Sequence, residues 1–354
     1  MISIIAVHAL RSGVSPSLRL GMAEGPWPTS GNQGSEYRQL AFAWAGFAPR
    51  IAGRRTSLWS ENLTGLTEPR GQRTCGLEEP CGQFIPEPIR GAMMTPTPTT
   101  DLRGQCDLLR ALHRSGDPLL LPNAWDVATA RVVVAAGFPV VATTSGGVAA
   151  TLGYEDEEGA PVDEMLGAAS RIANGVEVPV TIDAEAGYGL GPAELVTALR
   201  RAGAAGCNLE DTDHTAGVLR DPGRHAEWLG AVREAAAADG YPLVINARVD
   251  NFLGPFLAGT GPGTQDDLLP EAVRRATAYL EAGADCVYPI ALWETGPLRR
   301  FTAEVGGPVN VVRLPQAPST AELAALGVAR VSWGPFLHLG AMARFEEQLA
   351  SLQE

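Results

Sequence analysis

One stretch of the chain sets the expected architecture. Residues 178–210 read VPVTIDAEAGYGLGPAELVTALRRAGAAGCNLE. The first six of these residues are mostly apolar and β-branched, as in a strand that is buried on both faces. Residues 192–203 then show the apolar spacing of a helix that ends at a glycine, and a second apolar segment follows at 205–210. A strand, a helix and a strand in this order form the unit of a parallel sheet with crossover helices.

The same unit recurs along the chain from about residue 101. Eight strand-like segments alternate with eight helical ones, which favours an α/β fold of the closed (β/α)8 TIM-type barrel over a doubly wound sheet. The helix-to-strand joins AAGFPVV, RAGAAGCNL, EAGADCVYP and ALGVARVSW share a glycine where a helix must end. The expected strands are 119–122, 139–143, 178–183, 205–210, 242–249, 284–290, 308–313 and 328–333. The expected helices are 126–136, 163–174, 192–203, 224–238, 268–282, 295–304, 319–326 and 336–352.

The first 92 residues differ from the rest in charge and pattern. They hold nine Arg and seven Asp or Glu, whereas the remainder holds 18 Arg and 33 acids. They are rich in Gly and Pro and show no sustained helical or alternating period. We therefore expect 1–92 to be a disordered leader or an over-extended gene start, with a small accessory domain as the alternative. The catalytic barrel domain is expected at 93–354, starting at the adjacent Met93 and Met94.

Composition excludes several classes of function. The net charge of −13 and the pI of about 4.9 argue against a nucleic-acid partner. All 27 basic residues are arginine, and the absence of lysine excludes Schiff-base aldolases, pyridoxal-phosphate enzymes and Walker-type NTPases. Five cysteines without a CxxC pair indicate reduced thiols and a cytoplasmic protein. The opening apolar run is too short for a membrane span and lacks a basic n-region, so no membrane anchor or signal peptide is expected.

Acidic side chains gather at the ends of two predicted strands, where barrels of this type carry their functional groups. Asp183 and Glu185 follow one strand, and Glu210 ends the next. Because Asp183 and Glu185 are two residues apart, both can face the barrel mouth. Three carboxylates supply the oxygen ligands that Mg²⁺ or Mn²⁺ takes, so we predict a metal site at these strand ends. The alternative is that they are solvated loop acids.

Two further strand ends carry groups that bind anions. Arg248 lies on the strand after Glu210, and its planar guanidinium suits a substrate carboxylate or phosphonate. The alternative is that Arg248 neutralises Asp250 or the acidic cluster. A Thr-Ser-Gly-Gly turn after the second strand offers N–H groups and hydroxyls, which predicts an anion-binding or oxyanion-binding turn. Its residues are Thr144, Ser145, Gly146 and Gly147.

Four segments, in this order, resemble the isocitrate lyase/phosphoenolpyruvate mutase superfamily: TTSGGVAATLGYED, VPVTIDAEAGYG, GCNLED and INARVD. The resemblance covers roughly residues 105–350. It implies a (β/α)8 barrel, usually oligomeric, whose Mg²⁺ binds a 2-oxo acid or an enolpyruvate ligand. It implies that the metal shell includes, directly or through water, Asp183, Glu185 and Glu210. It also implies an acid near the metal at Asp156, and substrate contacts from Thr144, Ser145, Gly146 and Arg248.

The chain departs from the pattern of that superfamily in three places. Lyases there carry a basic loop with a cysteine, of KKCGH type, after the fourth strand, whereas this chain reads DTDHTAGVLRDP. Lyases have a tyrosine, and phosphonomutases a tryptophan, where this chain has Ala142. Phosphonomutases also have a histidine on strand 6, where this chain has Ile290. We therefore expect neither isocitrate or methylisocitrate lyase activity nor strict phosphoenolpyruvate mutase activity.

The changed loop requires a different proton carrier. His214 lies in that loop and is predicted as its acid/base, the alternative being a solvated histidine. Cys207 is no substitute, because it lies three residues before Glu210 on the same strand and should face the helix layer. Two long loops, 144–162 and 250–267, are expected to act as lids that exclude water from a reactive enolate.

Together these features predict a Mg²⁺-dependent enzyme that acts on a small 2-oxo or 2-hydroxy carboxylate through an enolate-like state. The favoured reaction is C–C bond cleavage, by a lyase or hydrolase, of an oxaloacetate-like or methylmalate-like acid. One alternative is P–C bond chemistry, as in phosphonopyruvate hydrolase or a carboxyphosphonoenolpyruvate or phosphoenolpyruvate mutase. Another is a barrel that binds a metabolite without catalysis. The expected partners are the substrate and further copies of the chain, in a dimer or tetramer.

Overall fold

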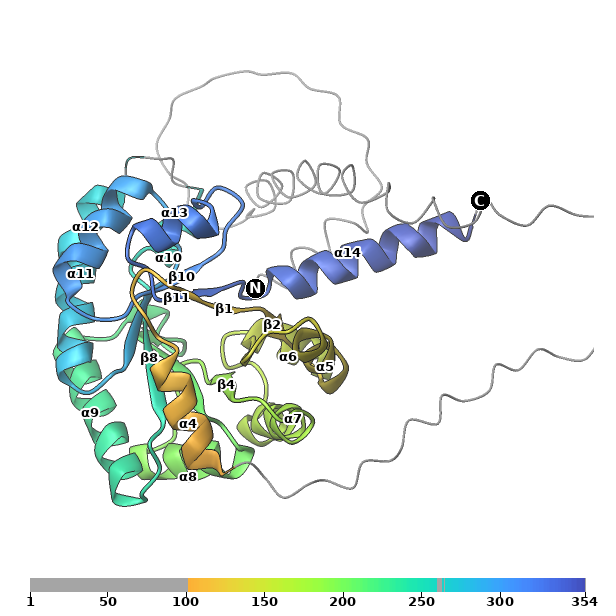
Figure 1. Ribbon diagram of the computed structural model, residues 1–354, viewed down its shortest axis with the longest axis horizontal. Coiled ribbons are helices and arrows are strands. Elements are labelled where there is room, and N and C mark those ends of the chain that lie inside the picture. The colour runs from red at the N-terminus through yellow and green to blue at the C-terminus, as the bar shows by residue number, and fades with distance from the viewer. Residues whose placement is uncertain (1–100, 260–262, 264, 354) are drawn as a thin grey trace, which may run out of the picture. The chain divides into compact units, whose positions relative to one another are not determined.

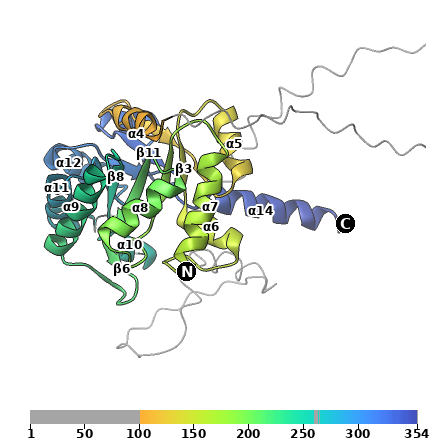
Figure 2. The same cartoon turned by 90° about the horizontal axis from the view of Figure 1, so that it is seen from below.

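The computed structural model describes residues 101–259, 263 and 265–353. The leader predicted at 1–92 lies outside the described residues. Within them, a ring of parallel strands is surrounded by helices, as Figure 1 and, turned by 90°, Figure 2 show. The predicted (β/α)8 barrel is therefore confirmed.

The strands pair in one closed cycle. One run of parallel strands follows the order β2-β3-β4-β5-β8-β9 and another the order β1-β11-β10. A parallel bridge between Val287 and Val309 joins β9 to β10, and β1 and β2 flank Pro122 to share one position in the ring. The strands are β1 Leu119–Leu121, β2 Asn123–Ala124, β3 Val141–Thr143, β4 Val180–Asp183, β5 Gly206–Glu210, β8 Val244–Val249, β9 Cys286–Pro289, β10 Asn310–Val312 and β11 Arg330–Ser332.

Each of the eight expected helices is present, with ends within about three residues of those expected. Local signals explain several ends: Asp126 and Ser319 each form a capping box, and Gly203 ends a helix in the left-handed conformation with φ 80°. The expected helices are α5 Val127–Ala135, α7 Val162–Asn174, α8 Pro192–Ala202, α9 Pro222–Ala238, α11 Gln265–Glu281, α12 Thr295–Val305, α13 Thr320–Ala325 and α14 Phe336–Ser351.

The structure corrects the expectation of long open loops. The segment 144–162 begins with helix α6, Ser145–Leu152, and the segment 250–267 contains helix α10, Leu253–Leu257. The loop after β5 forms a small antiparallel hairpin of β6, Thr212–Asp213, and β7, Val218–Leu219. Helix α4, Leu102–Ala111, precedes the first strand and was not expected.

The interior of the barrel is unusually polar. Branched aliphatic side chains normally fill this space. Here Asn246, Asn310 and Arg330 are buried on inward-facing positions, and Asn208 lies opposite Asn246 in the parallel register. These groups lie below the acidic side chains of the strand ends, so the barrel core and the barrel mouth form one polar system.

Helix α14, the last element of the described chain, extends away from the barrel. Both views show it projecting away from the strands and helices of the ring (Figures 1 and 2). In its 16 residues only His338 is buried, whereas Met342, Phe345 and Leu349 are 43%, 52% and 45% exposed. Among the helices of the described residues, none is long and apolar enough to cross a membrane.

Candidate active site

The predicted site residues lie at the carboxyl ends of consecutive strands. Asp183 ends β4 and Glu210 ends β5, which are neighbours in the parallel sheet. Glu210 pairs in register with Arg248 of β8, so both side chains occupy the same level of the barrel. The strand order therefore brings these three residues to one edge of the ring, as the sequence pattern predicts.

Asp183 is held on both carboxylate oxygens. Its Oδ2 accepts hydrogen bonds from the backbone N and the Oγ of Ser145, each at 3.0 Å. Its Oδ1 accepts one from Nδ2 of Asn208 at 3.2 Å. Thr144 is the N-cap of α6, so the first N–H group of that helix points at Asp183 and favours its negative charge. In the structure the predicted anion-binding turn thus binds a carboxylate of the protein; substrate binding by Thr144, Ser145 and Gly146 stays a prediction.

Asp156 packs against the same helix end. A Cβ atom added to Gly146 would lie 2.7 Å from Oδ2 of Asp156, so only glycine permits this approach. The Oδ1 atom of Asp156 is buried, with no hydrogen-bond partner among the described residues. Burial, and then the charge of Asp183, raise the pKa of Asp156. The carboxyl group of Asp156 thus lies beside Asp183 with one oxygen that has no hydrogen-bond partner among the described residues.

Glu185 is a buried acid in a strained backbone. Its φ of 48° lies in the left-handed region, which costs energy in a residue with a side chain. Its carboxylate accepts a hydrogen bond from the backbone N of Glu158, whose Oε1 in turn accepts one from the backbone N of Tyr188 at 2.5 Å. Burial, and then the charge of Asp156, raise the pKa of Glu185 to about 8.

Glu210 contacts two basic side chains, an arginine and a histidine. Its Oε1 lies 2.5 Å from Nε2 of His214, which stands on the β6–β7 hairpin, and its Oε2 forms an ion pair with Arg248. Burial raises the pKa of Glu210 to about 7, although Arg248 opposes this shift. Burial would lower the pKa of His214, but the hydrogen bond to Glu210 and its charge outweigh it, so the pKa is raised.

Arg248 is neutralised by protein carboxylates. Its Nε and Nη2 donate to the two oxygens of Asp250 at 2.6 and 2.9 Å, and its third nitrogen pairs with Glu210. This is the neutralising role that the sequence left open, and contact with a substrate stays a prediction. Asp250 is itself fixed by Thr212, whose hydroxyl donates to it at 2.6 Å, and by Asp211, which accepts from its backbone N.

The acidic cluster fits a hard divalent cation. Burial raises the pKa values of Asp156 and Glu185, and a neighbouring carboxylate raises each further, Asp183 for Asp156 and Asp156 for Glu185. A cation would relieve that repulsion. Among the described residues no three His, Cys, Asp or Glu side chains are gathered closely enough to enclose a metal ion. Protein ligands would thus supply only part of the shell, as is usual for Mg²⁺, which keeps several waters. Glu210 already has two partners, so its predicted part in the metal shell would be through water.

Cys207 faces away from this cluster. It is fully buried, and burial raises the pKa of its thiol to about 12. Its neighbour on β5, Asn208, points into the barrel and bonds Asp183, so the alternation of side chains along the strand places the thiol toward the helix layer.

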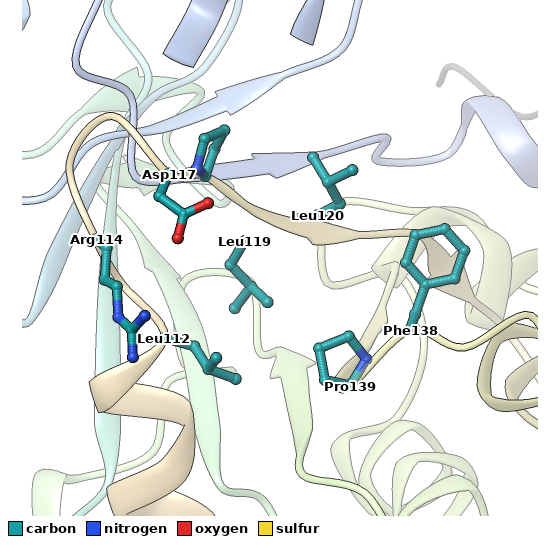
Figure 3. A pocket seen from close by; sticks show the side chains of 8 residues that line it. Leu112, Arg114, Asp117, Leu119, Leu120, Phe138 and Pro139 are labelled. Carbon is teal, nitrogen blue, oxygen red and sulfur yellow. The ribbon is translucent and has the colours of Figure 1, made fainter. Parts of the chain in front are cut away.

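A separate shallow pocket lies at the opposite end of the barrel. Its volume is ≈ 270 Å³, and Figure 3 shows its mainly apolar side chains around the start of β1 and the turn before β3. In TIM-type barrels that face is associated with stability and the carboxyl-end face with chemistry. The lining residues are Leu112, Arg114, Asp117, Pro118, Leu119, Leu120, Phe138 and Pro139.

Sequence reasoning missed three residues of the site. Asn208 lies two residues before Glu210 on one strand, so the alternation that placed Glu210 inside the barrel could also have placed Asn208 there. Arg330 is a charged residue within an otherwise apolar strand, and this pattern could have indicated a functional residue in the barrel. No sequence pattern indicated Glu158, because its contact with Glu185 depends on a loop conformation with φ 59° at Glu158.

Comparison with known proteins agrees with this geometry. The family model of phosphoenolpyruvate phosphomutase matches residues 109–353. The 2-methylisocitrate lyase of Escherichia coli is 30% identical, with 68% of this chain and 81% of the lyase covered. The oxaloacetate decarboxylase of Chromohalobacter salexigens is 30% identical, with 71% and 84% covered. A solved structure from Burkholderia cenocepacia, of a protein provisionally assigned as a phosphonomutase, is 40% identical with a TM-score of 0.65, covering 70% of this chain and 99% of that one.

The fold and the site define a class of protein: a (β/α)8 barrel whose strand ends hold buried carboxylates and a neutralised arginine. Within that class, the chain belongs to the phosphoenolpyruvate phosphomutase family of the isocitrate lyase/phosphoenolpyruvate mutase superfamily. The resemblance seen in the sequence is thus confirmed. Members of this superfamily are lyases and mutases, and this general enzymatic function extends to the chain.

The contact between Gly146 and Asp156 gives a prediction. We expect Gly146→Ala to displace the Asp156 carboxylate, because the new Cβ would overlap it. A displacement of about 1 Å at a reacting centre lowers turnover by roughly 10²-fold, while the fold is kept. Turnover and melting temperature should be measured together. Gly167→Ala is the matched control, since a Cβ there meets nothing within 4 Å in helix α7. Equal turnover of both variants and the parent protein would contradict the assignment.

Proposed function

We propose that this protein is a Mg²⁺-dependent lyase or hydrolase that breaks a C–C bond in a small 2-oxo or 2-hydroxy carboxylate through an enolate-like state. Mn²⁺ is the alternative metal. The observation that carries the proposal is the cluster of the buried Glu185 with the half-buried Asp156 and Asp183, in which the raised pKa values of Asp156 and Glu185 mark a place prepared for a cation. The relatives named for C–C bond cleavage, a 2-methylisocitrate lyase and an oxaloacetate decarboxylase, support an oxaloacetate-like or methylmalate-like substrate.

Each predicted residue has a role in this scheme. Asp183, Glu185 and Glu210 would hold the metal, directly or through water, with Asp156 beside them. When bound, Mg²⁺ would supply positive charge to the oxo group of the substrate. The N–H groups and hydroxyls of the turn would orient the substrate carboxylate, and Arg248 would bind its remote acidic group by exchanging a protein carboxylate for a substrate one. The residues of the turn are Thr144, Ser145 and Gly146.

His214 is the proposed proton donor to the departing product. Its raised pKa keeps the imidazole protonated to higher pH than usual, and Glu210 fixes the ring through Nε2. It stands on the β6–β7 hairpin, where superfamily lyases carry their loop cysteine. A proton carrier on this hairpin meets the requirement that the donor lies within reach of the strand ends.

P–C bond chemistry is the second candidate. The Burkholderia cenocepacia protein provisionally assigned as a phosphonomutase, 40% identical, favours it. Ala142 and Ile290 argue against it, because they replace the tryptophan and histidine of phosphonomutases. A barrel that binds a metabolite without turnover is the third candidate.

We further propose a cytoplasmic homo-oligomer. Cys106, Cys207 and Cys286 are free, buried thiols, in keeping with a reducing compartment. The exposed apolar side chains of α14 recur at intervals of three and four residues, so they form one face of the helix. A second copy of the chain is the partner that would cover this face, because Met342, Phe345 and Leu349 are exposed in the described part of a single chain.

The decisive experiment is turnover with a panel of acids. Oxaloacetate, 2-methylmalate and phosphonopyruvate should each be incubated with the protein and Mg²⁺ or Mn²⁺, and with a chelator as control. We expect C–C cleavage of a 2-oxo or 2-hydroxy acid that depends on the metal. Asp183→Ala should abolish both activity and the thermal stabilisation by Mg²⁺, while the overall fold is kept. Turnover of phosphonopyruvate alone would support the second candidate, and binding without turnover the third.

The proton donor can be tested separately. Because burial raises the thiol pKa of Cys207 to about 12, almost no thiolate exists at pH 8, and iodoacetamide should leave this cysteine unlabelled in the folded protein. Cys207→Ser should keep its turnover, whereas His214→Ala should lose about 10²–10⁴-fold. Peptide mapping and steady-state kinetics measure these effects. Substrate-protected inactivation through Cys207 would overturn the scheme, and an unaffected His214→Ala variant would remove the histidine from it.

The oligomer proposal predicts a change in molecular mass. We expect Phe345→Glu combined with Leu349→Glu to dissociate the assembly, because two charges then lie on the apolar face of α14. Glu347→Gln is the matched control, since Glu347 is exposed on the other side of the helix. Sedimentation velocity at micromolar concentration gives the masses. A monomeric parent protein would refute the proposal.

A further inference from the structure

Arg330 is a cation buried inside the barrel, below the site. It lies on β11, and its side chain is 1% exposed. Among the described residues no carboxylate lies within ion-pair distance of it, and its Nε and Nη1 have no hydrogen-bond partner. Burial of a guanidinium without a direct counter-charge is costly. A residue that lowers stability in this way calls for a functional explanation.

The one hydrogen bond of Arg330 crosses the barrel. Its Nη2 donates to Oδ1 of Asn208 on β5, at 3.1 Å. In the closed ring, β5 and β11 are four strand positions apart in either direction, so they lie on opposite sides of the barrel. Asn246, on the strand beside β5, donates to the same Oδ1 at 2.8 Å.

These donors fix the amide of Asn208. A guanidinium has donors only, so Asn208 must present its oxygen to Arg330 and its Nδ2 to the other side. That Nδ2 donates to Oδ1 of Asp183 at 3.2 Å, opposite the two bonds from Ser145. Burial lowers the pKa of Arg330, and the charge of Asp183 is among the interactions that oppose this shift, so the cation and the carboxylate act on each other.

We propose that Arg330 is a positioning residue that acts through Asn208 to fix the carboxylate of Asp183, and thereby sets the affinity of the site for Mg²⁺. The inference rests on the proposed function, in which Asp183 holds the metal. Arg330 touches neither the substrate nor the metal in this scheme. Arg330 orients the amide of Asn208, and that amide orients the carboxylate of Asp183. Its backbone belongs to the strand opposite β5, and its guanidinium reaches across the barrel to Asn208.

The test is Arg330→Met, which keeps much of the side-chain volume and removes the charge. Isothermal titration of Mg²⁺ into the substrate-free full chain should show binding weakened by about 10–100-fold, the range for partners that orient metal ligands. The metal-free melting temperature should be equal or higher, because an unpaired buried charge is gone. Arg330→Lys, which keeps the charge, should recover part of the affinity. A purely structural role predicts the reverse, a lower melting temperature with unchanged affinity.

A double-mutant cycle tests the path through Asn208. If Arg330 acts through that amide, Asn208→Ala and Arg330→Met together should weaken Mg²⁺ binding no more than the stronger single change. Arg233→Met is the matched control: this arginine pairs with Asp285 in the helix layer, so its loss should lower the melting temperature and leave Mg²⁺ affinity unchanged.

Several outcomes would overturn the inference. Unchanged Mg²⁺ affinity in a folded Arg330→Met variant would contradict it. Additive losses of Mg²⁺ affinity in the double-mutant cycle would also contradict it. Should Arg330→Met fail to fold, unchanged affinity in Arg330→Lys and in Asn208→Ala decides against it. A parent chain that binds no Mg²⁺ refutes the proposed function, and this inference with it. Normal binding in the parent and equal binding in the variants refutes this inference alone.

Discussion

Burial of negative charge at the mouth of the barrel is the constraint on which the rest of the structure depends. Carboxylates at neighbouring strand ends repel one another in a poorly hydrated place, and each must be balanced. Asp183 receives the N-terminus of α6 and the amide of Asn208, and Glu210 receives Arg248 and His214. The least balanced acids are Asp156 and Glu185, so a divalent cation gains most where they face Asp183.

The scaffold meets this constraint with polar partners that the protein itself supplies. Behind the mouth, Asp211 accepts hydrogen bonds from Arg275 and Tyr279 of α11 and from the backbone of Asp250. This buried network secures the strand end that carries Arg248 and the base of the β6–β7 hairpin. The polar interior reduces the apolar packing that usually fills such barrels, and it ties opposite sides of the ring to the site. Positioning is thus shared between the mouth and the core.

Most of the fold could be predicted from the sequence, because the patterns that indicate its strands and helices are local. Apolar runs, helical spacing and glycine at helix ends depend only on nearby residues, and they predicted all eight strand positions and eight helices of the barrel. The sequence pattern did not predict helix α6, because its sequence, SGGVAATL, has two glycines and no amphipathic period. It forms where its first N–H group meets the Asp183 carboxylate, which is a tertiary contact. Helix α10 and the β6–β7 hairpin are likewise short elements without a period of their own.

The sequence by itself determined the parallel barrel, the acids and the arginine at its strand ends, and the side of the strand on which Cys207 lies. Alternation along a strand has a period of two, so it tells which residues face inward without any knowledge of their neighbours. Only the tertiary structure decided which inward groups meet: Arg248 with Glu210 and Asp250, and Arg330 with Asn208. These last two are 122 positions apart in the chain. Closure of the ring brings them together, and no local pattern encodes the distance across a closed barrel.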